Sequence, residues 1–440
     1  MFIQKRRSKM WGILFAFVLL CSSVLYCAAK GTDTIENLYA NAAVLMDADS
    51  GRVLYGKNAD EVLPMASTTK IMTCILVLEM MEEGESAEVS AYAQSMPKVR
   101  LGVRKGETYL VEDLLYSLML ESHNDSAVVL AEHFGTKLLE STEKSCGEHS
   151  REESRKAVAA FAEKMNEKAA ELGLTKTYFI TPNGLDASEE VETGEGMVLK
   201  EHATTARELA QIMIYCIKES PKKDDFVKIT KTKSYSFTAN KRRISCANHN
   251  SLMNMMEGVG SGKTGFTNKA GYCYVGTLER DGKSFVVALL ACGWPGHKSW
   301  KWTDSKKLLQ YGLDHYQYHS FAADSFSFDA AKLPDIPVVG ARTMAGDRVA
   351  ACKVSVDFEN AQGIEGLLLN EGEEVRMEYS LQKVLRAPVE EGTVVGKLYY
   401  MVDDVVYRQN DLVAEQSVPA LDLPWCIRVT LQYFLLLGME

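Results

Sequence analysis

Closely spaced cysteines are missing from this 440-residue chain, whose ten cysteines include no C-x-x-C pair. Two of them, Cys21 and Cys27, lie in the first 29 residues, and the other eight are scattered through apolar runs. A disulfide framework or a structural zinc site normally shows a closely spaced Cys or Cys/His pattern. We therefore expect no metal and no cofactor, and we expect most of the cysteines to be small buried hydrophobes.

Positive charge is also scarce. The chain has 49 basic and 59 acidic residues, a net charge of −10, and four of the basic residues precede residue 30. The remainder of the chain has 45 basic against 59 acidic residues, or −14. Nucleic-acid phosphates bind proteins through Lys/Arg patches, so no nucleic-acid partner is expected for a chain this acidic.

The first 29 residues have the order of a secretory leader. Four positive charges in "MFIQKRRSKM" precede an apolar run that ends in Cys27-Ala28-Ala29. A basic region, an apolar region and small residues before the cleavage point predict a signal peptide over 1–29. An uncleaved membrane anchor is the alternative, because the run could just span a bilayer. With either interpretation, the rest of the chain leaves the cytoplasm.

The segment "GSGKTG" at 260–265 lacks the first glycine of a nucleotide-binding loop. That pattern needs a glycine five positions before Gly262, where this chain has Glu257. A phosphate-binding loop also opens a helix, whereas residues 272–292 predict two strands joined at Asp281-Gly282. We therefore expect Lys263-Thr264-Gly265 at the start of an antiparallel strand.

Hydrophobic patterns over 30–320 predict an α/β (α+β) domain in which helices flank an antiparallel sheet. Residues 41–55 predict a hairpin, and a buried helix is expected to begin near Ser67. A helical pattern over 111–135 is interrupted by turn formers at 122–125. The charged segment 140–156 predicts a solvated insertion.

The pattern changes near the C-terminus. Residues 321–340 predict a linker, 341–418 a small all-β domain, and 419–440 an amphipathic helix with Arg428 and Gln432 one turn apart. Sixteen residues after Pro424 extend only about 24 Å, less than the hydrocarbon core of a bilayer. We therefore expect this helix to lie on a membrane surface.

Ser67 and Lys70 form an S-x-x-K motif at the start of the predicted buried helix. Residues three apart share a helix face, so the amine can reach the hydroxyl. A serine becomes a strong nucleophile only when a base takes its proton, and a lysine can act as that base if burial favours its neutral form. A helix cap beside a surface lysine is the alternative for this motif taken alone.

Two further short motifs follow in the chain. Ser122-x-Asn124 supplies a hydroxyl and an amide suited to proton relay and to holding a substrate carbonyl. Lys263-Thr264-Gly265 supplies a cation and a hydroxyl suited to a carboxylate, and its glycine lets a substrate chain lie close to the strand. The order S-x-x-K, S-x-N, K-T-G is that of the penicillin-recognising enzymes.

The sequence resembles the low-molecular-weight penicillin-binding proteins, the serine-type D-Ala-D-Ala carboxypeptidases of the S11 peptidase family. The resemblance implies their catalytic fold and a membrane-associated enzyme that removes the terminal D-Ala from peptidoglycan pentapeptide stems. It also implies acylation by β-lactam antibiotics. Five stretches carry it: "LMDADSGRVLYGKNADEVLPMASTTKIMT" (45–73), "ESHNDSAVVLAEH" (121–133), "YFITPNGLD" (178–186), "EHATTARELA" (201–210) and "GKTGFTNKAGYC" (262–273).

The resemblance also implies roles for single residues. Ser67 corresponds to the acylated nucleophile, Lys70 to its general base and Ser122 to the group that passes a proton to the leaving D-alanine. Substrate-binding positions correspond to Asn124, Lys263, Thr264, Gly265 and Phe266. The backbone N–H groups of Ser67 and Phe266 correspond to the oxyanion hole.

Several positions depart from the family pattern. His123 stands where glycine is common, and Gly260-Ser261-Gly262 replaces an acid-Gly-apolar sequence. His249 lies where some members carry an arginine near the substrate carboxylate. We interpret His123 as a loop side chain at the edge of the cleft, with a proton-transfer role as the alternative, and His202 as structural.

Two other functions share part of this evidence. A class A β-lactamase has the same three motifs but uses a glutamate four residues before an asparagine for deacylation. No asparagine between Asn124 and Lys263 has that glutamate. A non-catalytic secreted wall-binding or scaffold protein would have no reason to keep all five of the residues Ser67, Lys70, Ser122, Asn124 and Lys263. Penicillin turnover and a covalent penicillin adduct would separate these alternatives.

Overall fold

The computed structural model describes residues 35, 37–139, 145–194, 196–321, 326, 328–343 and 349–437. The predicted signal peptide lies outside these residues. The chain divides into two compact units, which are taken in turn. The N-terminal unit comprises Ile35–Ser327 and Ile364–Glu371, and the C-terminal unit contains Phe328–Gly363 and Gly372–Glu440.

The N-terminal unit is built on a five-stranded antiparallel sheet of order β11-β12-β13-β1-β2. Its strands are β1 (Ala42–Asp47), β2 (Val53–Lys57), β11 (Val259–Thr267), β12 (Gly271–Arg280) and β13 (Lys283–Leu290). Asp281 and Gly282 both have positive φ, 56° and 72°, as a tight hairpin turn requires. The predicted hairpins at 41–55 and 272–292 are therefore confirmed.

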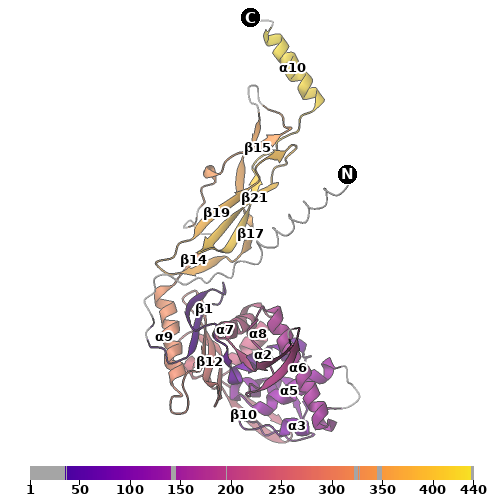
Figure 1. Cartoon of the computed structure of the whole chain (residues 1–440), viewed down its shortest axis with the longest axis vertical. Coiled ribbons are helices and arrows are strands. Elements are labelled where there is room, and N and C mark those ends of the chain that lie inside the picture. The colour runs from indigo at the N-terminus through magenta and orange to yellow at the C-terminus, as the bar shows by residue number, and fades with distance from the viewer. Residues whose placement is uncertain are drawn as a thin grey trace. The chain divides into compact units, whose positions relative to one another are not determined.

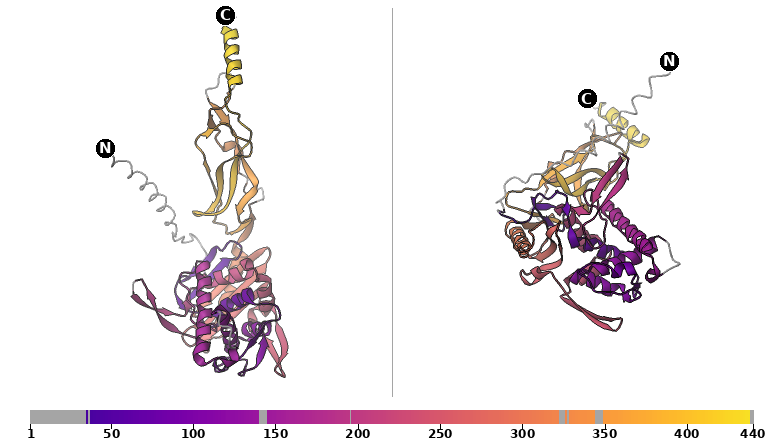
Figure 2. Two further views of the ribbon diagram at one scale, coloured as in Figure 1. Left: turned by 90° about the vertical axis from the view of Figure 1, so that its right-hand side faces the viewer. Right: turned by 60° about the horizontal axis from the view of Figure 1, so that its bottom comes forward.

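The two faces of the sheet bury different sets of side chains, because alternate residues of a strand point to opposite sides. Val44 and Met46 of β1 pack in the core formed with α2 (Lys70–Met80), α5 (Asn124–Leu138) and α7 (Ala206–Ile214). Leu45 packs in the opposite core with α9 (Trp300–His315). Accordingly α9 lies on one side of the sheet, and α2, α7 and α8 (Lys223–Lys231) lie on the other (Figure 1, Figure 2). The predicted α/β (α+β) fold class is thus confirmed.

The remaining elements surround this sheet. The helices are α3 (Ala91–Gln94), α4 (Val111–Tyr116) and α6 (Arg151–Glu171). Short strand pairs are β3 (Leu63–Pro64) with β8 (Ala203–Thr204), β4 (Ser86–Glu88) with β5 (Thr108–Leu110), β6 (Ser188–Thr193) with β7 (Gly196–Glu201), and β9 (Ser234–Ala239) with β10 (Arg242–Ala247).

Two local predictions were wrong. Cys146 and His149 are buried within the segment predicted as a solvated insertion, because they pack against α5, and α6 already begins at Arg151. Ser150 caps α6 in a capping box with Glu153, a signal that marks a helix start. Lys263-Thr264-Gly265 lies in the middle of β11 and not at its start, because pairing with β12 extends back to Val259.

The C-terminal unit is built from strands, as predicted. One sheet has the order β17-β22-β21-β19 and another β16-β15-β20. Their bounds are β15 (Ile336–Val339), β16 (Ala350–Cys352), β17 (Val354–Gly363), β19 (Arg376–Leu381), β20 (Leu385–Arg386), β21 (Val394–Val402) and β22 (Val405–Ala414). Strand β15 falls inside the range predicted as a linker, because Ile336 and Val338 are buried and pair with β16.

One strand from the range predicted as the β-domain belongs to the N-terminal unit. Strand β18 (Gly366–Leu369) pairs with β14 (Gln317–Ser320), and Leu368 packs in the core beside α9. Arg52 Nη1 donates to Leu368 O at 2.9 Å. All four residues of β18, Gly-Leu-Leu-Leu, are buried. A strand that is apolar on both faces has to be packed on both faces, and the N-terminal unit provides that packing.

The last element of the described residues is helix α10 (Leu423–Leu437). No helix within the described residues is both long and apolar enough to cross a membrane.

Candidate active site

Ser67 and Lys70 meet at the start of helix α2. The 3₁₀ turn η1 (Ala66–Thr69) carries Ser67, and α2 begins at Lys70, so the two side chains lie on one face. Lys70 Nζ lies 2.8 Å from Ser67 Oγ. The distance is short enough for direct proton transfer between the hydroxyl and the amine.

Lys70 is fully buried and surrounded by neutral acceptors. Its Nζ lies 3.0 Å from Asn124 Oδ1 and 2.5 Å from Asn183 O. Burial, together with the charge of nearby Lys263, holds the pKa of Lys70 well below its usual range. The lowered pKa favours the neutral amine, the form that can accept a proton.

Ser122 and Lys263 form a second hydroxyl–amine pair. Ser122 lies between η2 (Ser117–Glu121) and α5 in a left-handed conformation, φ 65° and ψ 31°, which is the predicted break in the helical pattern. Lys263 Nζ donates to Ser122 Oγ at 2.9 Å and to Thr264 O at 2.9 Å. Burial lowers the pKa of Lys263 to about 7.

Gly265 allows strand β11 to lie against the turn that carries Ser67. A Cβ atom at Gly265 would come 2.9 Å from Ser67 N and 3.2 Å from Met65 O. The close approach brings the backbone of β11 beside the Ser67 N–H, one of the two groups expected to form the oxyanion hole. Phe266 follows on the strand with its side chain partly exposed and its ring 4.6 Å from that of Tyr272.

The loop at Asn183-Gly184 completes the surroundings of Ser67, and its role was missed from the sequence. Asn183 O accepts from Lys70 Nζ and lies 3.4 Å from Ser67 Oγ. Gly184 has φ +83°, and a Cβ there would lie 2.0 Å from Ala66 O. The Pro-Asn-Gly turn signal was visible in "YFITPNGLD", but nothing in the sequence showed that the turn reaches η1.

Asp125 is a second residue that sequence reasoning missed. Its buried carboxylate accepts from the backbone N–H groups of Leu101, Gly102 and Val103 at 2.8, 2.8 and 3.2 Å. Asn124 N donates to Val99 O at 2.8 Å. Together these bonds hold the segment 99–103 beside the Ser122-x-Asn124 motif.

The three histidines singled out in the sequence have separate surroundings. His202 is buried, its Nε2 lies 2.8 Å from Thr69 Oγ1, and its Nδ1 accepts from Ile180 N, while burial lowers its pKa to about 3. This neutral ring ties η1 to the 180–184 loop, which agrees with a structural role. His123 Nδ1 lies 2.8 Å from Ser117 Oγ, and burial lowers the pKa of this ring. The exposed His249 lies 3.2 Å from the Glu121 carboxylate.

The geometry thus brings the three motifs together. Bonds join Ser67 to Lys70, Lys70 to Asn124 and Ser122 to Lys263, although the motifs are far apart in the chain. Such a set can support acyl transfer to a serine, with one amine to take a proton and another beside a second hydroxyl. Within the described residues, the hydrogen bonds of Ser67 and Lys70 go to no carboxylate.

Known proteins are similar to this chain in sequence and in fold. Residues 29–138 and 155–291 match the S11 peptidase family, described as D-alanyl-D-alanine carboxypeptidase, and residues 369–420 match the C-terminal domain of penicillin-binding protein 5. The D-alanyl-D-alanine carboxypeptidase DacF of Bacillus subtilis is 27% identical over 389 residues, 86% of each chain. DacC of Escherichia coli is 27% identical over 421 residues, 92% of this chain and 90% of DacC.

A solved structure supports the same assignment at the level of fold. Penicillin-binding protein 5 of Haemophilus influenzae superposes with a TM-score of 0.61 at 24% identity, over 88% of this chain and all of that one. The family match covers more than half of the chain and includes all three motifs. The chain therefore belongs to the S11 family of serine-type D-alanyl-D-alanine carboxypeptidases.

Proposed function

We propose that this carboxypeptidase releases the terminal D-alanine from peptidoglycan pentapeptide stems through an acyl-enzyme on Ser67, and that β-lactams acylate the same hydroxyl. The observation that carries the proposal is the buried Lys70 amine, 2.8 Å from Ser67 Oγ. A lysine with a lowered pKa can take the serine proton as the hydroxyl attacks the carbonyl.

Acylation follows from the positions of the other groups. Ser67 Oγ bonds to the carbonyl carbon of the penultimate D-Ala, and the N–H groups of Ser67 and Phe266 stabilise the resulting oxyanion. The peptide C–N bond then breaks as Ser122, beside Lys263, passes a proton to the D-alanine nitrogen, and the proton that Lys70 took from Ser67 restores the Ser122 hydroxyl. Lys263 and Thr264 bind the terminal carboxylate, Asn124 holds the peptide, and Gly265 leaves room for the substrate backbone.

In deacylation, water hydrolyses the ester on Ser67, which releases the tetrapeptide stem and the free enzyme. A class A β-lactamase accelerates this step with a glutamate. The described bonds of Ser67 and Lys70 go to a hydroxyl, an amide oxygen and a backbone carbonyl, which supports slow turnover of penicillin.

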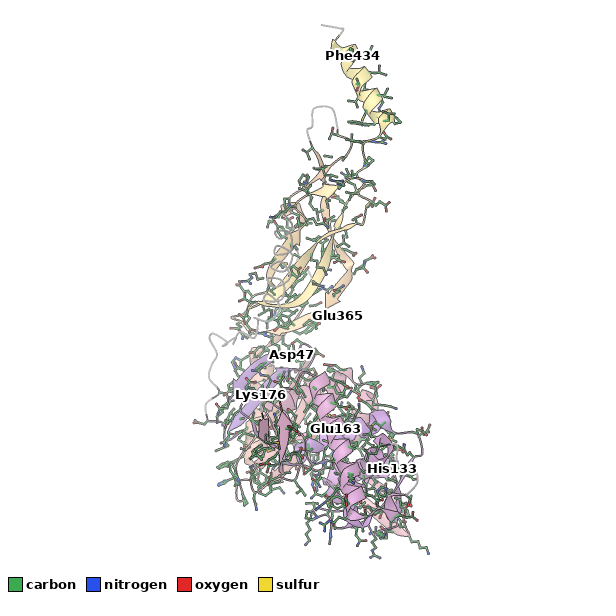
Figure 3. The ribbon with its side chains drawn as sticks, turned by 45° about the vertical axis from the view of Figure 1, so that its right-hand side comes forward. Asp47, His133, Glu163, Lys176, Glu365 and Phe434 are labelled. Atoms are coloured by element: carbon green, nitrogen blue, oxygen red, sulfur yellow. The ribbon has the colours of Figure 1, made fainter. Side chains whose placement is uncertain are left out.

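We also propose that α10 holds the protein on the outer face of the cytoplasmic membrane. Its exposed apolar side chains recur at helical spacing and form one stripe: Leu423, Ile427, Leu431, Phe434 and Leu435. Phe434 is labelled near the end of the helix in Figure 3. Fifteen residues extend about 22 Å, so the stripe suits the membrane interface and not a complete crossing.

The direct test is mass spectrometry of a synthetic pentapeptide stem before and after incubation with purified protein. The expected result is loss of one alanine mass and a tetrapeptide product. The same protein incubated with benzylpenicillin should gain a covalent adduct at Ser67 that persists far longer than a β-lactamase intermediate. Rapid penicillin turnover without pentapeptide cleavage would favour a β-lactamase, and neither reaction would favour a scaffold.

A further inference from the structure

A cluster of metal-ligating side chains lies outside the active site. Glu132 of α5, Cys146 of the turn η3 (Cys146–Glu148) and His149 bring one ligand atom each to within 4.8 Å of one another. All three residues are buried, with exposed fractions of 1%, 6% and 8%. Figure 3 labels His133, the residue after Glu132, and Glu163 of α6, the helix that packs beside α5.

The Glu132 carboxylate is held in a fixed orientation. Ser90 Oγ donates to Oε2 at 2.5 Å, and Ser154 Oγ donates to Oε1 at 2.6 Å. His149 Nδ1 lies 3.1 Å from Oε1 and is the one ion-pair partner of Glu132 among the described residues. Buried carboxylates are normally hydrogen-bonded, paired with a positive charge or bound to a metal, and within the described residues Glu132 has two serine hydroxyls and one imidazole as partners.

We propose that Glu132, Cys146 and His149 bind a zinc ion through three protein ligands. One thiolate, one imidazole and carboxylate oxygens form a donor set that suits zinc better than calcium or magnesium, which prefer oxygen alone. The proposal replaces the expectation, drawn from cysteine spacing, that the chain binds no metal.

The geometry fits this ion. Two ligands on tetrahedral zinc, one nitrogen and one oxygen, are about 3.4 Å apart when each bond is near 2.1 Å. His149 Nδ1 and Glu132 Oε1, at 3.1 Å, need to move apart only slightly to share it. The Ser90 and Ser154 hydroxyls then act on the ligand carboxylate, as hydrogen-bond donors behind metal ligands usually do.

Binding replaces protons by the metal. Burial raises the pKa of the Cys146 thiol to about 11, so the free thiol is neutral. When zinc binds, the S–H proton passes to solvent and the thiolate sulfur forms the bond to zinc, with no change of oxidation state. The ion then joins the 145–149 segment to α5 through one bonded centre.

The ion has no part in the chemistry at Ser67. Glu132 is eight residues after Asn124 on α5, about 12 Å along the helix axis. Release of D-alanine is therefore expected to persist in excess EDTA at the assay temperature, whereas the thermal midpoint should fall once zinc is lost.

The decisive measurement is the metal content of the full secreted chain. The protein is produced without a polyhistidine tag in zinc-supplemented medium, dialysed and analysed by inductively coupled plasma mass spectrometry. The expected result is about one zinc ion per chain. Cys146→Ser and His149→Gln should each lose most of it, while Cys216→Ser, a buried cysteine outside the cluster, should keep it.

Cobalt(II) tests ligand identity without relying on activity. Cobalt added to chelator-stripped protein should produce a thiolate-to-cobalt charge-transfer band that disappears in Cys146→Ser and remains in Cys216→Ser. Ser154→Ala should keep the band but weaken cobalt binding roughly 10- to 100-fold. Wild-type protein with less than about 0.1 zinc per chain and no cobalt band would overturn the proposal and leave a His149–Glu132 hydrogen bond.

Discussion

Lys263 Nζ lies 2.9 Å from Ser122 Oγ, which joins the K-T-G strand to the break between η2 and α5. The contact places a buried amine beside the hydroxyl that we expect to protonate the leaving D-alanine. The same amine is expected to meet the terminal carboxylate of the substrate. We therefore expect Lys263 to couple substrate recognition to proton transfer.

Replacing Lys263 should mainly affect acylation. A hydrogen bond to a charged group contributes about 1.5–3 kcal/mol, so Lys263→Ala should acylate roughly ten- to a hundredfold more slowly with both peptide and penicillin. Lys263→Arg keeps the charge but brings a larger planar group, so it should recover only part of the rate.

The measurement is the rate of covalent penicillin labelling under pseudo-first-order conditions. Lys283→Ala is the matched control, since it removes another buried lysine of the same sheet, whose Nζ bonds to Leu313 O. Equal labelling rates for Lys263→Ala and wild type would show that Lys263 supports the strand and not the reaction. Thermal midpoints of both variants show how much fold stability each change costs.

The pH dependence of acylation should be bell-shaped. Lys70 acts as a base only when neutral, and burial beside Lys263 lowers its pKa, so the rate should fall as pH drops through that lowered pKa. Lys263 binds a carboxylate only when charged, and burial places its pKa at about 7 in the free protein, so the rate should fall as pH rises above that value. In Lys263→Arg the alkaline fall should disappear while the acid fall remains. The pH profile of the second-order rate constant for penicillin labelling tests both limbs. An unchanged alkaline limb in Lys263→Arg would show that another group causes the alkaline fall.

Ser67→Ala should abolish both the penicillin adduct and release of D-alanine, because Ser67 is the one described hydroxyl that is hydrogen-bonded to the Lys70 amine. Intact-protein mass spectrometry detects the adduct, and the thermal midpoint verifies that the variant is folded. A Ser67→Ala protein that still gains the penicillin mass would show that another residue is acylated.

Gly184→Ala should disturb the active site through the backbone. Its φ is +83°, and the added Cβ would meet Ala66 O at 2.0 Å and Ser67 N at 2.9 Å. Gly173→Ala is the matched control, since Gly173 also has positive φ, +72°, with open space where the Cβ would be. Each change carries the left-handed penalty of about 1–2 kcal/mol. Only Gly184→Ala should in addition slow penicillin labelling, and equal labelling by the two variants would contradict a role for this contact.

Removing α10 should release the protein from membranes. Truncation after Asp422 deletes the apolar stripe and leaves the described strands of both units in place. Flotation with anionic phospholipid vesicles should recover the full-length mature chain with lipid and the truncated chain in solution, with equal pentapeptide cleavage by the two. A truncated chain that still binds membranes in cells would make the uncleaved N-terminal segment the better anchor.

Sequence patterns alone determined the family, the three motifs and the main hairpins of this protein. Each depends on short-range chemistry: residues three apart on a helix share a face, and an Asp-Gly pair favours a hairpin turn. The all-β character of the C-terminal unit also followed from alternation along single strands. The proximity of Ser67 to Lys70 followed from helical spacing alone, without any tertiary contact.

Only the tertiary structure decided which distant segments meet. Asn183 O at Lys70, the Asp125 carboxylate at the 101–103 backbone and strand β18 in the N-terminal unit are contacts between residues far apart in the chain. The sequence predicted that Cys146 and His149 belong to a charged surface segment. In the structure they pack against α5 beside Glu132. Local patterns do not encode such pairings, because burial of a polar group depends on the partner that the rest of the fold brings to it.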